Sequence, residues 1–294
     1  MSPTLKRALS WIGSALGILG VAFVGLKLLN YSHQLPIDKI SFFQWLGVGA
    51  LSLVYGASGF LLALAWRDIV RYLGVNIRRG WAVWAYGVSQ LAKYVPGNVF
   101  HLAGRQALGV SAGIPPWPLG KSMAWELGTI ASMASLFALL IVPSFFRVPT
   151  IIALLLFACV AVMFIVLIWR LFGPDLARAA ALQLVFLGLS GIVFAVLFRL
   201  LGGEWNLVLV CGAYVIAWLI GLVTPGAPAG VGIRETVLFF LLRGSIGQAD
   251  LLEIILIGRL VTAVGDLVFF LAASLGFSGR PTGLLTERRD IAST

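Results

Sequence analysis

Charged residues are scarce in this chain of 294 amino acids. Only 11% of the residues are charged, 60% are hydrophobic, and the mean hydropathy is +1.02. Soluble domains carry about 25% charged residues, most of them on the surface. The scarcity of charge excludes a soluble globular protein and predicts a polytopic membrane protein.

Acidic residues are scarcer than basic ones: 11 Asp and Glu oppose 21 Lys and Arg, and the formal net charge is +10. In a soluble protein this balance would indicate a nucleic-acid partner. Here the basic residues lie between apolar runs, and no basic helical face or aromatic stacking stripe accompanies them. We therefore expect no nucleic-acid partner and attribute the charge to the positive-inside rule of membrane topology.

Cysteine is nearly absent, since the chain has only Cys159 and Cys211. Both lie inside apolar runs, where we interpret them as small packing residues. The sequence also lacks a metal-ligand spacing, a DxD motif, a Ser-His-Asp set and a nucleotide-binding loop. It therefore predicts no metal, no cofactor, no direct use of ATP and no catalytic residue.

Long apolar runs dominate what is present. A helix of about 20 residues, rising 1.5 Å per residue, spans the roughly 30 Å of bilayer hydrocarbon. Seven stretches reach this length: 9–29, 43–65, 122–142, 150–169, 181–201, 206–224 and 254–276. We expect an all-α transmembrane bundle of about seven to eight spans, forming a single domain over 1–276, with a polar C-terminal tail over 277–294.

The charges between the runs orient the bundle. Basic residues gather in alternate connections, namely Lys6 and Arg7, then Arg67, Arg71, Arg78 and Arg79, then Arg170 and Arg178. This alternation predicts a multi-pass protein with a cytoplasmic N-terminus, which we assign to the cell inner membrane on the family resemblance described below. No small-x-small cleavage motif follows the first run, so we expect that run to stay as a signal anchor. The side of the C-terminus stays open.

Two segments, 80–113 and 225–249, are too broken for a clean span. Each contains Pro-Gly and then a Gly followed closely by Arg, in "YVPGNVFHLAGRQALGV" and "LVTPGAPAGVGIRETVLFF". Proline breaks a helix and glycine tolerates the turn that follows. The candidate breaks are Pro96, Gly97, Gly104, Pro225, Gly226, Gly230 and Gly232. Each segment should form a re-entrant hairpin or a cytoplasmic loop. An inverted internal repeat and a chance similarity both stay open.

The arginines that follow these breaks predict an anion site. Helix N-termini present free N–H groups, and Arg105 and Arg234 lie just beyond the breaks. Two such ends, both dipping from the cytoplasmic side, would form a cationic pocket for a phospholipid or polyprenyl-phosphate headgroup. His101 shares a helical face with Arg105. The alternatives are interfacial snorkelling for the arginines, a structural hydrogen bond for His101, and a topological role for Lys93 and Lys121.

Ionisable residues within the apolar runs need a partner or a wet cavity, because a charge in the bilayer costs about 2.5–3.5 kcal/mol. We expect Glu126 to pair with Arg105 or Arg234. We expect Glu235 to bind a cationic headgroup or its neighbour Arg234.

Two further intramembrane charges, Arg259 and Asp266, lie two turns apart on one helical face. Asp266 is expected to pair with an arginine of another helix. A purely structural role in holding the bundle together is the alternative for both residues. The predicted substrate-binding set is His101, Arg105, Glu126, Arg234 and Glu235.

A resemblance to a known family rests on two strings, "LAKYVPGNVFHLAGRQ" and "TPGAPAGVGIRETVL". They resemble the signature segments of the lysylphosphatidylglycerol synthase transmembrane-region family, and the likeness in span layout covers nearly the whole chain. That family includes the flippase half of the bacterial multiple peptide resistance factor. This chain differs in the "AP" within "PGAPAGVGIRE" and in lacking the acidic residue that other members carry after the first break.

The resemblance implies translocation of a lipid between leaflets and no synthase activity. The substrate would be an anionic or aminoacylated phospholipid or a polyprenyl-linked lipid. An ion gradient through Glu126, Asp266 or His101 is one hypothesis for the coupling. The main alternative is a non-catalytic partner of a glycosyltransferase or envelope polysaccharide system. A membrane enzyme with Glu126 and Glu235 as acid and base is the least supported function.

Overall fold

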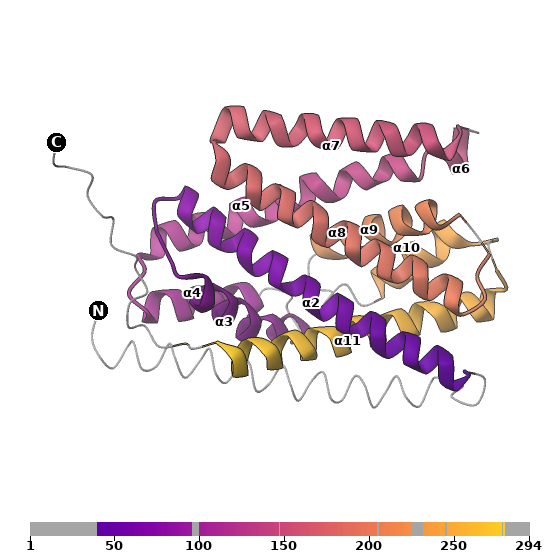
Figure 1. The fold of residues 1–294 in the computed structure, drawn as a ribbon, viewed down its shortest axis with the longest axis horizontal. Coiled ribbons are helices and arrows are strands. Elements are labelled where there is room, and N and C mark those ends of the chain that lie inside the picture. The colour runs from indigo at the N-terminus through magenta and orange to yellow at the C-terminus, as the bar shows by residue number, and fades with distance from the viewer. Residues whose placement is uncertain are drawn as a thin grey trace.

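The computed structural model describes residues 40–95, 100–146, 148–204, 206–224, 232–244, 246–277 and 279. These residues form helices and no strand, which confirms the all-α prediction for this part of the chain (Figure 1). The predicted first span, 9–29, and most of the predicted tail, 277–294, lie outside the described residues.

Among the described residues, five helices are long and apolar enough to cross a membrane. They are α2 (Phe42–Tyr72), α5 (Pro116–Ser135) with its continuation η3 (Leu136–Leu140), α7 (Thr150–Phe172), α8 (Pro174–Leu200) and α11 (Gln248–Gly276). They confirm five of the seven predicted spans and identify an integral membrane protein. The total of seven to eight spans is not confirmed, because the predicted span 206–224 forms only the 17-residue helix α9 (Leu207–Val223).

The two broken segments each form a pair of short helices. The first hairpin consists of α3 (Arg79–Gln90) with η2 (Leu91–Tyr94), and α4 (Phe100–Ser111). The second hairpin consists of α9 and α10 (Ile233–Leu242). In each hairpin the two arms pack against each other. The short helix α6 (Pro143–Phe146) joins η3 to α7.

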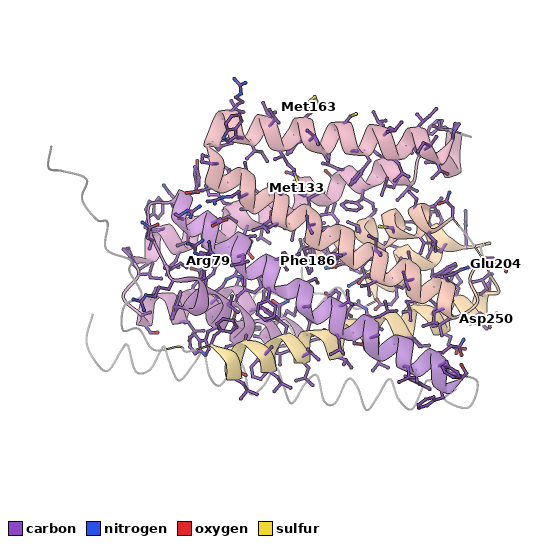
Figure 2. The ribbon with its side chains drawn as sticks, in the orientation of Figure 1. Arg79, Met133, Met163, Phe186, Glu204 and Asp250 are labelled. Atoms are coloured by element: carbon purple, nitrogen blue, oxygen red, sulfur yellow. The ribbon has the colours of Figure 1, made fainter. Side chains whose placement is uncertain are left out.

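Cross-helix contacts define the two ends of the bundle. Arg71 near the end of α2 pairs with Asp175 at the start of α8, whereas Gln44 at the start of α2 bonds the carbonyl of Leu200 at the end of α8, over 3.0 Å. We call the first the basic end and the second the opposite end. Arg79 lies at the basic end, and Glu204 and Asp250 lie at the opposite end (Figure 2).

The hairpins enter the bundle from different ends. The first hairpin follows α2 and begins at Arg79, so it enters from the basic end. The second begins at the opposite end, where the Asn206 side chain bonds Thr150 at the start of α7 over 2.7 Å. The prediction that both dip from the cytoplasmic side is therefore wrong. The prediction treated 206–224 as a complete crossing of the membrane. Because this stretch is instead the first arm of the second hairpin, the predicted side of that hairpin was reversed.

Local sequence explains where the long helices begin. Ser41 and Gln44 form a capping box at the start of α2, in which each side chain accepts a backbone N–H of the other residue. Prolines open α5 and α8 at the first helical turn, where a missing N–H costs nothing. Apolar side chains cover the outer surface of α7, including Ile151, Leu155 and Met163 (Figure 2). This surface is suited to lipid.

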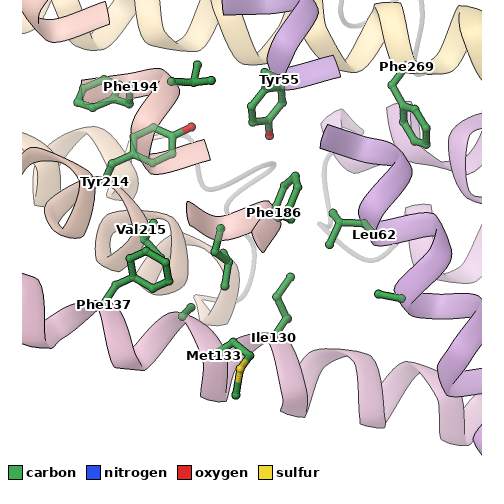
Figure 3. Packing of buried hydrophobic residues seen from close by; sticks show 14 of the residues in the cluster. Tyr55, Leu62, Ile130, Met133, Phe137, Phe186, Phe194, Tyr214, Val215 and Phe269 are labelled. Carbon is green, nitrogen blue, oxygen red and sulfur yellow. The ribbon is translucent and has the colours of Figure 1, made fainter. Parts of the chain in front are cut away.

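Helix α2 is the centre of the bundle, packing on both α8 and α11. It crosses α11 where Gly56 meets Gly265, and a Cβ added to Gly265 would lie 2.7 Å from the Ser52 carbonyl oxygen. Figure 3 shows the aromatic layer beside this crossing, where Tyr55 and Phe186 have ring centroids 6.2 Å apart. Small residues at this crossing let the two backbones approach closely.

Gly265→Ala is expected to destabilise the protein by about 1–3 kcal/mol, because the backbones must separate to admit the methyl group. The measurement is the free energy of unfolding in mixed detergent micelles. Gly49→Ala on α2 is the matched control, since nothing lies within 4 Å of its Cβ position. A loss no larger at Gly265 than at Gly49 would contradict this account of the crossing.

Candidate functional site

One buried cavity of about 100 Å³ lies where the two hairpins meet inside the bundle. Its first-hairpin lining is Tyr86, Gln90, Lys93, Tyr94, His101 and Leu102, and its second-hairpin lining is Trp218, Gly221, Leu222 and Arg234. Helices α2, α5, α8 and α11 complete the wall, with Tyr55, Glu126, Phe186, Arg259 and Asp266 among their contributions. The two broken segments thus share one cavity although they enter from opposite ends.

Arg105 is held behind the cavity wall. Its side chain is only 1% exposed and forms an ion pair with Glu126 of α5. The guanidinium carbon lies 4.3 Å from the ring centroid of Tyr86 and 4.8 Å from that of Trp66. The Tyr86 hydroxyl donates to the other oxygen of Glu126 over 3.0 Å. Glu126 lines the cavity, whereas Arg105 does not. Because Arg105 forms an ion pair with Glu126, we interpret it as a residue that positions Glu126.

Arg234 lines the cavity directly and is 5% exposed. Its guanidinium carbon lies 4.2 Å from the ring centroid of Tyr214, which itself stacks on Phe194 at 4.7 Å (Figure 3). Within the described residues no carboxylate lies within ion-pair distance of Arg234. A buried cation without a carboxylate, on the wall of a cavity, is a candidate anion-binding group.

Glu235 has a different partner from the one predicted. It forms an ion pair with Arg259 of α11, not with its neighbour Arg234. Its other oxygen accepts the Gly232 N–H over 2.6 Å and so caps α10. Gly232 has a φ of +88°, which favours glycine over any other residue at this helix start. Glu235 does not line the cavity, but its partner Arg259 does.

Asp266 also has an unexpected partner. Its carboxylate lies 2.8 Å from the Lys93 ammonium and accepts the Tyr94 hydroxyl over 2.5 Å and the Gln90 amide over 3.5 Å. The predicted arginine partner is therefore wrong, and Lys93, which the sequence suggested to be topological, lines the cavity. The carboxylate joins α11 to the end of the first hairpin arm. Arg259 and Asp266 share a helix but pair with different hairpins.

Two unpartnered polar groups lie in the second arm of the first hairpin. His101 lines the cavity, and its buried Nδ1 has no hydrogen-bond partner among the described residues. The Gln106 amide likewise has neither a donor nor an acceptor partner there. His101 thus combines a place on the cavity wall with a buried Nδ1 that has no partner among the described residues.

The remaining predicted break residues divide into two groups. Gly104 is buried within α4 and Gly232 begins α10. The others, Pro96, Gly97, Pro225, Gly226 and Gly230, lie outside the described residues. Among the residues that the structure describes, no group of three or more His, Cys, Asp or Glu side chains could hold a metal ion.

The two hairpins repeat one arrangement. In each, an arginine of the second arm stacks on a tyrosine of the first: Arg105 on Tyr86, and Arg234 on Tyr214. In each, a residue of the second arm also forms an ion pair with the long helix that follows. The sequence did not identify Tyr86 and Tyr214 as site residues. A signal was present, because each tyrosine precedes the Pro-Gly of its own segment by a similar number of residues. This shared relation favours an inverted internal repeat over chance similarity.

No protein-family model matches the sequence, and no curated protein matches it significantly.

Proposed function

We propose that this protein is a flippase-like membrane protein that moves a lipid headgroup between leaflets through the shared cavity. The substrate class is an anionic or aminoacylated phospholipid or a polyprenyl-linked lipid. The observation that carries the proposal is the meeting of two hairpins from opposite ends at one cavity that charged side chains line. Broken helices that meet between inverted repeats are typical of transporter binding sites.

The polarity of the cavity supports a headgroup site. Three cations and two carboxylates from four elements face one small space inside an apolar bundle, where each charge is costly. Charged groups at membrane depth need a partner or a wet cavity, and the described arms of both hairpins line this one. The resemblance to the lysylphosphatidylglycerol synthase transmembrane-region family is consistent with the same class of function.

The distribution of charge supports an orientation. Arg67, Arg71, Arg78, Arg79, Arg170 and Arg178 gather at the basic end. By the positive-inside rule this end faces the cytoplasm, so the second hairpin enters from the outer face. An N-terminus on the cytoplasmic side of the inner membrane fits this orientation.

Arg234→Gln is expected to reduce lipid translocation at least about tenfold, because it removes the buried cation that would hold the headgroup. The measurement is the loss of the inner-leaflet fluorescence of labelled phosphatidylglycerol that dithionite cannot reach in protein-free liposomes. Arg199→Gln is the matched control, since the Arg199 side chain is 58% exposed at the opposite end.

Two results would contradict the proposal. If proteoliposomes with wild-type protein move lipid no faster than protein-free liposomes, the proposed flippase function is wrong. If Arg234→Gln translocates lipid at the wild-type rate, Arg234 does not bind the headgroup and the proposed site is wrong. In the first case, co-purification with a glycosyltransferase would favour the alternative of a non-catalytic partner subunit.

A further inference from the structure

Among the residues that the structure describes, the charges buried around the cavity do not cancel. Each carboxylate of the site already has a basic partner within the protein: Glu126 has Arg105, Glu235 has Arg259 and Asp266 has Lys93. Among the described residues around the cavity, Arg234 is the cation left over. Its guanidinium lies over the ring of Tyr214.

The two segments between the hairpin arms that lie outside the described residues add no charge. The segments 96–99 and 225–231 read "PGNV" and "PGAPAGV" and contain no ionisable side chain. The two hairpins differ in the residue that follows the arginine. Arg234 is followed by the acidic Glu235, whereas Arg105 is followed by the neutral Gln106.

Within the described part of the site, no carboxylate is free to receive a positively charged ligand group. Asp266 accepts from three side chains, and Glu126 from Arg105 and the Tyr86 hydroxyl. An ammonium group would have to displace an internal cation, and it would then add positive charge to a site that already has a surplus. A group with one negative charge would instead complete the balance.

We propose that the site selects a lipid headgroup with one net negative charge and no ammonium: a phosphodiester whose remaining polar groups are hydroxyls. This inference rests on the proposed function and narrows its substrate class, excluding aminoacylated lipids. The phosphate binds Arg234, whose guanidinium plane is fixed by Tyr214 and so presents paired donors to it. The headgroup hydroxyls bond His101 Nδ1.

The test is native mass spectrometry of the purified protein equilibrated with equal amounts of three lipids of identical acyl chains. The lipids are phosphatidylglycerol, phosphatidylethanolamine and lysyl-phosphatidylglycerol. We expect phosphatidylglycerol to be retained at least about tenfold over the other two, the size of effect that one charge-assisted contact provides. Arg234→Gln should lose this preference, and Arg199→Gln should keep it. An excess of soluble glycerol phosphate should not displace the bound lipid.

The outcomes separate this inference from the function on which it rests. If either ammonium lipid is retained as well as phosphatidylglycerol, or Arg234→Gln keeps the preference, the inference is overturned while translocation can still be measured. Displacement by glycerol phosphate would overturn the lipid assignment. If the protein retains phosphatidylglycerol through Arg234 but translocates no lipid, the headgroup preference is supported and the proposed flippase function is wrong. Arg234→Lys, which keeps the charge, checks that a lost preference reflects charge and not unfolding.

Discussion

Arg105→Gln is expected to destabilise the protein by about 3–5 kcal/mol, because it leaves the Glu126 carboxylate buried without its cation. The Tyr86 hydroxyl would remain as a donor to Glu126, but it carries no compensating charge. Glu126→Gln should cost a similar amount, since Arg105 is 1% exposed and would keep only the rings of Trp66 and Tyr86. The measurement is the free energy of unfolding in mixed detergent micelles.

The double variant gives the sharper result. Arg105→Gln with Glu126→Gln removes both charges at once, so its loss should be smaller than the sum of the two single losses. Arg170→Gln is the control, because Arg170 is exposed and should contribute less than about 0.5 kcal/mol. Additive single losses would mean that Arg105 and Glu126 do not act as a pair and would contradict their assignment as one buried unit.

Asp266→Asn is expected to be more damaging than Lys93→Gln, although the two residues form one ion pair. Without the carboxylate, Lys93 would face Arg234 and Arg259 across the same cavity, so the surplus of positive charge would double. Without the ammonium, Asp266 would keep Tyr94 and Gln90 as donors and the attraction of both arginines. We expect losses of about 3 kcal/mol for Asp266→Asn and about 1–2 kcal/mol for Lys93→Gln.

The comparison between these two variants tests the charge balance itself. The same unfolding titration applies, with the wild-type protein and Arg199→Gln measured in parallel. A larger loss for Lys93→Gln than for Asp266→Asn would show that the buried carboxylate, not the surplus cation, limits the site. That order would contradict the charge balance on which the anion preference depends.

Composition and apolar runs were enough to predict the helical membrane fold and five of its long helices. They were not enough to distinguish a span from a hairpin arm. The run 206–224 is apolar throughout, and hydropathy carries no information on whether α9 crosses the bilayer or turns back. The Pro-Gly at 225–226 was the available signal for a turn.

For the site, the sequence located the charged residues but not all of their partners. The pairing of Glu126 with Arg105 was one of two predicted options and is confirmed. The partners of Glu235 and Asp266 were wrong, because helical spacing relates residues on one helix and not across helices. Lys93 was assigned to topology because it flanks an apolar run, and only the packing of α11 against the first hairpin brings it to Asp266.

The measurement that tests this account most directly is cross-linking of the two hairpins in the native membrane. Leu102→Cys on the first hairpin and Leu222→Cys on the second both line the shared cavity and can be combined with Cys159→Ala and Cys211→Ala. A short bifunctional maleimide is predicted to join them within one chain. A failure to cross-link, while a Gln44→Cys and Leu200→Cys pair at the opposite end does react, would contradict the meeting of the two hairpins around one cavity.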